Sequence, residues 1–243
     1  MIKLEKLQKS FHGRPVLRDL SFEAPDGAIT GLLGVNGAGK TTTLRAICGV
    51  LQPESGSITI DDETGESGSP QMQQNVGALL DHMGLYARLT VRENLEYFGR
   101  LRGMSGQSLS NSVDRVISIL GLEAIADRPT AGFSQGERVK TALGRAVLHS
   151  PKNLLLDEPT NGLDILTIRS LRELLKRLRD EGTCVIFSSH VLEEVRALCD
   201  TVVVISQGRI AGQGSATKLC SQTSTGSLED AFVQLTSAGD ARI

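Results

Sequence analysis

"GVNGAGKTT", residues 34–42, joins two stretches of different character. The residues before it, "AITGLLG" (28–34), form a short apolar run, which is typical of a buried strand. The residues after it, "TTTLRAICGVL" (41–51), have the pattern of a helix. A glycine-rich loop between a strand and a helix can curl so that several backbone N–H groups face one anion. The sequence therefore predicts an α/β fold that holds phosphate at this loop.

The side chains of this loop indicate how phosphate and a metal ion would be held. Lys40 brings a positive charge to the terminal phosphates, and the Thr41 hydroxyl can ligate Mg²⁺. The alternative is a glycine-rich turn that matches the pattern by chance, and the flanking strand and helix weigh against it. The candidate contacts to the nucleotide are Gly34, Val35, Asn36, Gly37, Ala38, Gly39, Lys40, Thr41 and Thr42.

The stretch "LLLDEPT", residues 154–160, supplies the complementary carboxylates. Three leucines predict a buried strand that delivers Asp157 and Glu158 to its carboxyl end, where ligands collect in open α/β sheets. Asp157 is placed to hold Mg²⁺, and Glu158 to orient and polarise an attacking water. The alternative is a helix N-terminus that carries acidic residues, which Pro159 makes plausible by itself.

The stretch "SSH", residues 188–190, ends another apolar run. From a strand end, His190 could contact the γ-phosphate and hold the attacking water together with Glu158. A lone histidine at a strand end is more often structural. The position of His190 after the two phosphate-binding motifs favours a catalytic role.

Strands and helices alternate along most of the chain, a pattern that predicts a largely parallel sheet covered on both faces. Further apolar strands are expected at 152–159, 183–190 and 200–208, with an amphipathic helix at 164–181. The middle differs, since its three helical stretches contain no convincing strand. We predict an α/β core at 1–82 and 141–243 and an inserted helical subdomain at 83–140; residues 61–71 read as a polar surface loop.

Composition limits the class of protein. The 243 residues carry a net charge of −2, so nothing in the charge indicates a nucleic-acid partner. No apolar run approaches the roughly 20 residues that a membrane-spanning helix needs, and the first residues lack a signal-peptide core. A cytoplasmic location is expected. The four cysteines lie far apart without metal-ligand spacing, and we interpret them as reduced packing residues.

With these motifs in this order, nearly the whole chain resembles the nucleotide-binding subunit of an ATP-binding cassette (ABC) transporter. Three further matches support the resemblance: "FSQGE" (133–137) in place of the family signature, "NGLD" (161–164) as the D-loop, and Phe11 as the aromatic residue that stacks on adenine. The resemblance implies a P-loop NTPase cassette with a RecA-like, mixed or parallel sheet, an N-terminal antiparallel β region and an inserted helical subdomain. It also implies ATP and Mg²⁺ as cofactors, and ATP hydrolysis that uses Glu158, His190 and Lys40.

The family implies a head-to-tail homodimer in the ATP-bound state, in which the signature loop of one subunit closes on the ATP of the other. Ser134, Gly136, Glu137 and Asp164 would then contact that nucleotide. The usual signature is LSGGQ, and the glutamine at 135 replaces a glycine, which puts the tightness of the loop in doubt. The alternative for "FSQGE" is a helix capping box from Ser134 to Glu137, and both can hold.

The resemblance also implies a partner. Closure of the dimer would be passed to a separate transmembrane permease subunit, with the ATPase peripheral on the inner face of the cell membrane and no nucleic acid bound. The nearest pattern is that of the NatA-type ATPases of sodium-extruding exporters, although similar ATPases serve exporters of drugs, lipids or polysaccharides. A cassette ATPase of DNA repair would need a long coiled-coil insertion, and the insertion here is too short. A translation-type cassette protein normally carries two cassettes, and this sequence has one. A non-hydrolysing assembly module is disfavoured by Lys40, Asp157, Glu158 and His190.

The stretch "ALLDHMGLYARLTVREN", residues 78–94, matches the Q-loop between core and helical subdomain. Asp81 stands where the family has Gln or Glu, and we predict that it approaches Mg²⁺ through water or only on closure. The alternative is an Asp that merely ends a strand. Beyond it, Tyr86 is predicted to receive a short helix of the membrane subunit. The alternative is a core aromatic cluster, and for Phe98 we expect the core.

Overall fold

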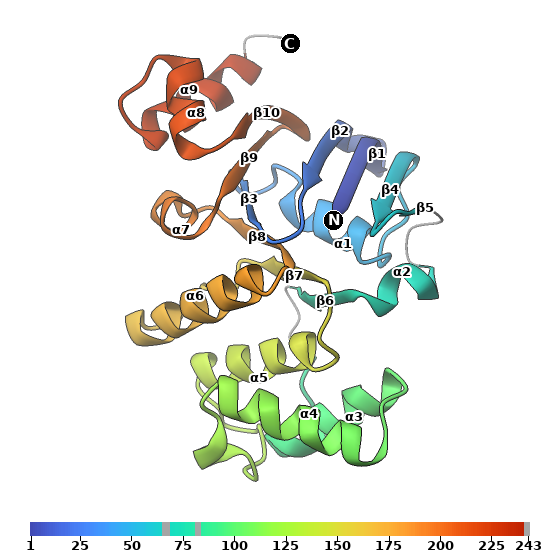
Figure 1. The fold of residues 1–243 in the computed structure, drawn as a ribbon. Coiled ribbons are helices and arrows are strands. Elements are labelled where there is room, and N and C mark those ends of the chain that lie inside the picture. Colours follow the sequence, from blue (N-terminus) through green and yellow to red (C-terminus); the bar gives the residue numbers. More distant parts are fainter. Residues whose placement is uncertain (65–68, 81–83, 241–243) are drawn as a thin grey trace.

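The computed structural model describes residues 1–64, 69–80 and 84–240 of the chain. Its centre is a six-stranded sheet in the order β10-β9-β3-β8-β7-β6 (Figure 1). All neighbouring strands are parallel except β9 and β10. The predicted strands are confirmed in this sheet, and so is its largely parallel character. Its members are β3 (Ile29–Leu33), β6 (Val76–Leu79), β7 (Asn153–Asp157), β8 (Cys184–Ser189), β9 (Thr201–Ser206) and β10 (Arg209–Gly214).

A second, antiparallel sheet confirms the expected N-terminal β region and corrects one prediction. Its order is β2-β1-β4-β5, formed by β1 (Ile2–Phe11), β2 (Arg14–Ala24), β4 (Ser55–Ile60) and β5 (Glu63–Thr64). The interpretation of 61–71 as a surface loop was wrong at both ends. Asp61 and Asp62 both have positive φ, the backbone of a two-residue hairpin turn, and this turn returns the chain to pair with β4. Helix α2 (Pro70–Gln74) then begins behind an N-cap, Ser69.

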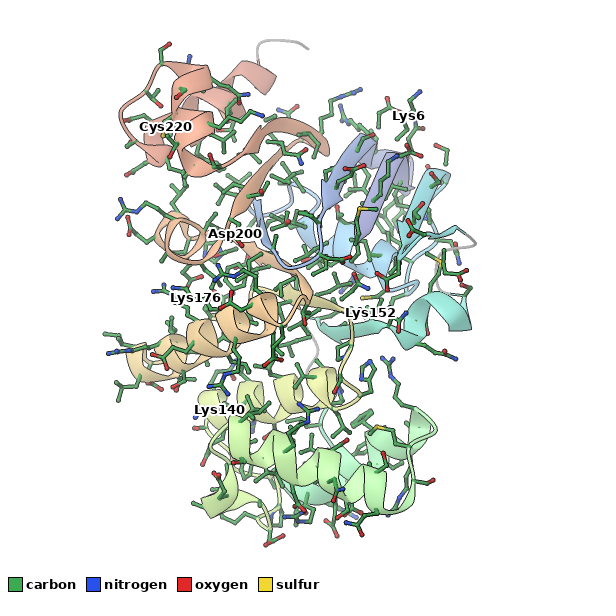
Figure 2. The ribbon with its side chains drawn as sticks, in the orientation of Figure 1. Lys6, Lys140, Lys152, Lys176, Asp200 and Cys220 are labelled. Atoms are coloured by element: carbon green, nitrogen blue, oxygen red, sulfur yellow. The ribbon has the colours of Figure 1, made fainter. Side chains whose placement is uncertain are left out.

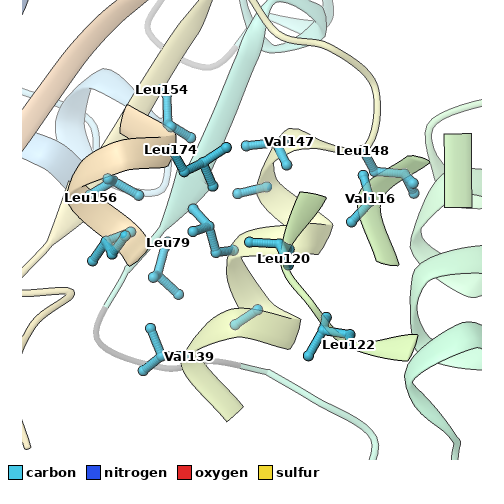
Figure 3. Close-up of a cluster of buried hydrophobic side chains, with 14 of the residues drawn as sticks. Leu79, Val116, Leu120, Leu122, Val139, Val147, Leu148, Leu154, Leu156 and Leu174 are labelled. Atoms are coloured by element: carbon cyan, nitrogen blue, oxygen red, sulfur yellow. The ribbon is translucent and has the colours of Figure 1, made fainter. Parts of the chain in front are cut away.

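The segment between β6 and β7 is helical, as predicted, and Figure 1 shows these helices gathered at one end of the molecule. They are α3 (Val91–Leu101), α4 (Gly106–Ile119), η1 (Glu123–Ile125) and α5 (Gln135–Val147). The buried cluster in Figure 3 joins Leu154 in the sheet and Leu174 beside it to Val116 and Val147 on the helices. The helices therefore share a core with the sheet. The proposed boundary after residue 140 falls inside α5, and the division into two domains stays a prediction.

The remaining helices are α1 (Lys40–Ile47), α6 (Ile165–Asp180), α7 (Leu192–Leu198), α8 (Ala216–Thr223) and α9 (Leu228–Asp240). Asp200, labelled in Figure 2, helps to fix α6 against the sheet. Its carboxylate accepts a hydrogen bond from the Ile29 N–H at 2.8 Å and lies 3.2 Å from the Arg179 guanidinium. Within the described part of the chain, each helix lacks the length or the apolarity that a membrane crossing needs.

Strand register brings the chemical motifs to one edge of the six-stranded sheet. Strands β7, β8 and β3 are adjacent and parallel, so their carboxyl ends lie side by side. Asp157 at the end of β7 is level with Ser188 on β8, and Ser189 is level with Leu33 on β3. Loops that are more than 100 residues apart in sequence therefore start from the same edge.

Candidate functional site

The phosphate loop is curled around its own lysine. Gly37 and Gly39 have φ angles of 81° and 115°, a region that only glycine enters without strain. A side chain at Gly39 would also meet the Leu17 side chain at 3.0 Å. The Lys40 ammonium donates a hydrogen bond to the Gly34 carbonyl at 2.7 Å and is only 6% exposed. Its charge is thus held at the N-terminus of α1, where an anion is stabilised by the helix dipole.

Asp157 lies between two hydroxyl groups. The Thr41 hydroxyl donates to Asp157 Oδ2 at 2.7 Å, and the Ser188 hydroxyl donates to Asp157 Oδ1 at 2.6 Å. A hydroxyl and a carboxylate side by side are oxygen ligands of the kind Mg²⁺ prefers. In the ranges that the structure describes, no group of three His, Cys, Asp or Glu residues could hold a metal alone. This fits a Mg²⁺ ion that takes one or two protein ligands and completes its shell with water and phosphate.

Glu158 connects the lysine to the histidine. One carboxylate oxygen lies 3.3 Å from the Lys40 ammonium, and the other lies 2.8 Å from His190 Nδ1. The Glu158 backbone has a φ of 46°, a conformation that costs about 1–3 kcal/mol in a residue other than glycine. Its N–H is fixed by the Ser188 hydroxyl at 2.9 Å. Such strain persists only where neighbours enforce it, and it is common at functional sites.

Ser188 joins the candidate site, although the stretch "SSH" gave no sign of a function for it. It is fully buried, donates to Asp157 and accepts the N–H of Glu158, so it fixes both carboxylate-bearing residues. A pairing register of β7 and β8 would have pointed to it, because Ser188 lies opposite Asp157. Register depends on contacts between distant segments and could not be obtained from the motif alone.

The signature segment forms a capping box, which confirms the structural alternative. The Glu137 N–H donates to the Ser134 hydroxyl at 3.3 Å, and the Ser134 N–H donates to the Glu137 carboxylate at 2.8 Å. This second bond holds the pKa of Glu137 below its usual value. A side chain at Gly136 would meet the Thr167 hydroxyl at 3.3 Å. The start of α5 therefore packs against the first turn of α6.

Asp164 caps that first turn of α6. Its carboxylate accepts the hydroxyl of Thr167 at 2.7 Å and the N–H of Thr167 at 2.9 Å, and these bonds lower the pKa of Asp164. Between described residues, neither a hydrogen bond nor an ion pair joins Ser134 or Asp164 to the phosphate loop. The structure thus separates these candidates from the cluster around Lys40.

Two other candidates stand apart. Phe11 ends β1 with its ring 42% exposed, and the Lys9 ammonium lies 5.7 Å from the ring centroid. Asp81 lies outside the described residues, so its predicted approach to Mg²⁺ stays a prediction.

The aromatic side chains near the Q-loop form an exposed cluster. The Tyr86 ring lies 5.0 Å from that of Tyr97 and 5.9 Å from that of Phe98, and both tyrosines are at least 40% exposed. The placement of Phe98 in the core was wrong: it is half-buried under the Arg145 guanidinium and lines a cavity of about 300 Å³. Val91 and Leu95 lie on the same side of α3 as Phe98, and they are the fully buried residues of that side.

Asn94 anchors the loop that carries Tyr86. Its side-chain oxygen accepts the Tyr86 N–H at 2.9 Å, and its side-chain nitrogen donates to the carbonyls of Tyr86, Leu89 and Thr90. Asn94 is 1% exposed. Nothing in the sequence distinguishes this residue, because a buried asparagine and a surface asparagine look alike at a polar helix start.

Comparisons with known proteins place these features in context. A protein-family model described as ABC transporter matches residues 17–161. The chain is 38% identical to the ABC transporter ATP-binding protein NatA of Bacillus subtilis, over 90% of this chain and 91% of that protein. It is 33% identical to the linearmycin resistance ATP-binding protein LnrL of Bacillus subtilis, over 98% of this chain and 76% of the relative.

A solved structure gives the same result for the fold. It is described as the ATP-binding subunit of an ABC transporter, and the two structures align with a TM-score of 0.89 at 28% identity. The alignment covers 97% of this chain and 99% of that chain. The similarity therefore extends across both sheets and the helices between β6 and β7.

Proposed function

We propose that this chain, which belongs to the ABC transporter family as an ATP-binding subunit with ATPase activity, powers an exporter whose cargo path lies in a separate membrane subunit. The observation that carries the proposal is the contact of Glu158 with both Lys40 and His190. A buried cation, a carboxylate and an imidazole at the carboxyl ends of parallel strands are suited to phosphate binding and water activation.

Each of these residues has a distinct role in the proposal. Lys40 binds the terminal phosphates. These phosphates compete with the Glu158 carboxylate for the ammonium group of Lys40. The freed Glu158 carboxylate accepts a proton from the attacking water, while His190 holds that carboxylate in position through Nδ1. Mg²⁺, when held by Thr41 and Asp157, would supply positive charge to the phosphates. The remaining residues of 34–42 surround the phosphates with backbone N–H groups.

We further propose that a second copy of the chain completes the site. The signature loop packs against α6 and makes no hydrogen bond to the phosphate loop among the described residues, so its exposed end is available to another subunit. In a head-to-tail dimer, Ser134, Gly136 and Glu137 would face the ATP of the partner copy, with Asp164 beside them. The exposed ring of Phe11 would stack on adenine.

The membrane subunit would dock on the aromatic cluster of Tyr86, Tyr97 and Phe98. The exposed rings of Tyr86 and Tyr97, together with Leu101, which is 67% exposed, suit the apolar face of a short helix. The segment 83–140 would move as the docking subdomain relative to 1–82 and 141–243, and Asp81 would join the two regions. Attachment through the permease places the ATPase on the inner face of the cell membrane.

Sodium ions are the proposed cargo, because the chain covers most of a relative named NatA and resembles the NatA-type ATPases of sodium-extruding exporters. A drug is the second candidate, since a similar relative is named for linearmycin resistance. Cargo contacts belong to the membrane subunit, so the residues of this chain do not choose between the two.

The test begins with the purified protein, ATP and Mg²⁺, for which we expect steady release of phosphate that stops when Mg²⁺ is chelated. The protein is then co-purified with its membrane subunit and placed in vesicles with the phosphate loop outside. ATP-dependent accumulation of sodium inside the vesicles supports the sodium exporter. Accumulation of an antibiotic without sodium assigns the second cargo, and the absence of ATP hydrolysis by the purified chain contradicts the proposal as a whole.

A further inference from the structure

A buried carboxylate outside the cluster described above connects the segments that carry Glu158 and His190. Glu194, in the first turn of α7, is only 7% exposed. Its Oε2 accepts the Thr160 hydroxyl at 2.6 Å and the Ser189 hydroxyl at 3.0 Å. Thr160 and Ser189 are themselves 6% and 0% exposed. One carboxylate oxygen therefore joins the loop after β7 to the end of β8 in a water-poor setting.

The two hydroxyl groups belong to residues that lie close in sequence to Glu158 and His190. Thr160 follows Glu158 by two residues, and Ser189 directly precedes His190. The residue pairing of β7 and β8 ends at Asp157 and Ser188, and the Glu158 N–H continues it by donating to the Ser188 carbonyl at 3.2 Å. Beyond the ladder, the Glu194 carboxylate bonds both chain segments. We infer that Glu194 is a positioning residue, which holds Glu158 and His190 at the separation that their hydrogen bond and the hydrolysis of ATP require.

The local structure favours a positioning role over a generic packing role for Glu194, Thr160 and Ser189, which we call the brace. The Ser189 hydroxyl donates to Glu194 and also accepts the Val191 N–H at 2.9 Å, so the chain on both sides of His190 is fixed. Among the described residues, no Lys, Arg or His forms an ion pair with Glu194. Its neighbour Glu193 is exposed and instead pairs with Arg196 on the surface. Removing the Glu194 carboxylate is costly, because the buried hydroxyls of Thr160 and Ser189 both lose their acceptor.

This inference rests on the proposed ATPase site, and its first test is a pair of neighbouring substitutions. Glu194→Ala should lower kcat about 10²-fold, the effect of a small misplacement of catalytic groups, while ATP affinity changes little. Glu193→Ala removes a carboxylate from the same helix without touching the brace and should hydrolyse ATP like the wild type. Glu194→Gln keeps an acceptor oxygen and should recover most of the activity. Equal kcat values for Glu194→Ala and Glu193→Ala would overturn the inference.

A second pair covers the case in which Glu194→Ala does not fold. Thr160→Ser retains the hydroxyl that binds Glu194, whereas Thr160→Val keeps the shape of the side chain and loses the bond. We expect Thr160→Val to lower kcat at least about tenfold below Thr160→Ser, with similar affinity for ATP. If the two variants have the same kcat, the hydroxyl does not position the site and the inference is wrong.

A spectroscopic measurement separates positioning from loss of stability. With isotope-labelled histidine, the imidazole nitrogen signals of His190 report its hydrogen bond to Glu158. The chemical shifts of these signals should change in Glu194→Ala and in Thr160→Val. They should be the same as in the wild type in Glu193→Ala and Thr160→Ser. His149 is an internal control, since it is remote from the brace and bonds the Val76 carbonyl. Unchanged His190 signals in a variant with reduced kcat would contradict the inference.

The readouts also distinguish this inference from the proposed function. If the wild-type protein fails to hydrolyse ATP, the proposed function fails, yet the His190 signals still test whether Glu194 fixes the Glu158–His190 pair. If the wild type is active and Glu194→Ala is equally active, only the positioning role fails.

Discussion

The edge of the sheet around Lys40 and the start of α5 around Ser134 both carry motifs of the proposed nucleotide site. The side chains of the two regions make contacts of opposite kinds. At the sheet edge, side chains from three distant segments contact one another: Lys40 meets Glu158, Glu158 meets His190, and Thr41 meets Asp157. At the start of α5, Ser134 and Glu137 contact each other, and Gly136 lies close to Thr167.

The difference indicates which part of the proposed site one chain can assemble. Parallel pairing of β3, β8 and β7 brings the segments that carry the proposed catalytic side chains to one edge of the sheet. The signature segment is stabilised locally by its capping box, so its fold is independent of nucleotide. In the proposed dimer, the ATP that it contacts is held by the other copy. The predictions below test this asymmetry, in order of decreasing effect on activity.

Glu158→Gln should remove about 10³-fold of the hydrolysis rate, because the amide cannot accept the proton of the attacking water. The variant keeps the size of the side chain, so ATP should still bind and hold the dimer together. Phosphate release measures the first effect and size-exclusion chromatography with ATP the second. Glu193→Gln, on an exposed surface, is the matched control, and normal turnover in Glu158→Gln would refute the role of the carboxylate.

Lys40→Ala should weaken ATP binding about 10²-fold, since it removes a buried cation from the phosphates. Titration with a fluorescent ATP analogue measures the change. Lys152→Ala removes an exposed lysine next to β7 and should bind ATP like the wild type. An unchanged ATP affinity in Lys40→Ala would rule out the phosphate-loop assignment.

Gly136→Asp addresses the signature segment. An acidic residue suits the first turn of α5, and its carboxylate would repel the phosphates held by a partner copy. Because a side chain here also comes near Thr167 and the Asp164 carboxylate, circular dichroism checks that the variant is folded. We expect ATP-dependent dimerisation and turnover to fall about tenfold or more. Gly136→Ala, which adds a methyl group without charge, should have a much smaller effect.

Mixing Gly136→Asp with Lys40→Ala then distinguishes a shared site from a site within one chain. Each mixed dimer of head-to-tail geometry retains one site with intact Lys40 and intact Gly136. Random pairing makes about half the dimers mixed, so roughly a quarter of the wild-type rate should return. No recovery on mixing would contradict the shared site.

Tyr86→Ala should uncouple the ATPase from the membrane subunit. Loss of an exposed ring at a docking surface should lower transport per ATP about fivefold, while the ATPase of the isolated chain stays the same. Tyr86→Phe keeps the ring against Tyr97 and Phe98 and serves as the control. Vesicle transport measured beside phosphate release gives the ratio, and full coupling in Tyr86→Ala would show that the ring is not a docking contact.

Asn94→Ala should change stability and leave the basal ATPase rate nearly unaltered. The substitution removes the buried side chain that accepts the Tyr86 N–H and donates to three carbonyls, so the free energy of unfolding should fall by about 1–3 kcal/mol. Chemical denaturation measures this loss. Asn111→Ala, at an exposed position bonded to Gln107, should cost much less. If both variants are equally stable, Asn94 does not anchor the loop of Tyr86.

Much of the fold was predictable because its signals are local. A buried strand such as Asn153–Asp157 contains a continuous run of three leucines, and the helix from Ile165 to Asp180 shows its periodicity in the sequence. The comparisons confirm the predicted family and cassette fold. The hairpin at Asp61–Asp62 was missed because its turn residues are polar and its strand is only two residues long. The inward placement of Phe98 failed because a half-buried position at a cavity has the same helical spacing as a core position.

The amino-acid sequence by itself determined which chemical groups the protein possesses: a glycine-rich loop with Lys40, a strand that ends in Asp157 and Glu158, and a strand that ends in His190. Only the tertiary structure decided how these groups meet. Strand order and register place Ser188 opposite Asp157, enforce positive φ at Glu158, and bring Thr160 and Ser189 to the same oxygen of Glu194. These relations depend on segments about 30 residues apart, so no local pattern specifies them.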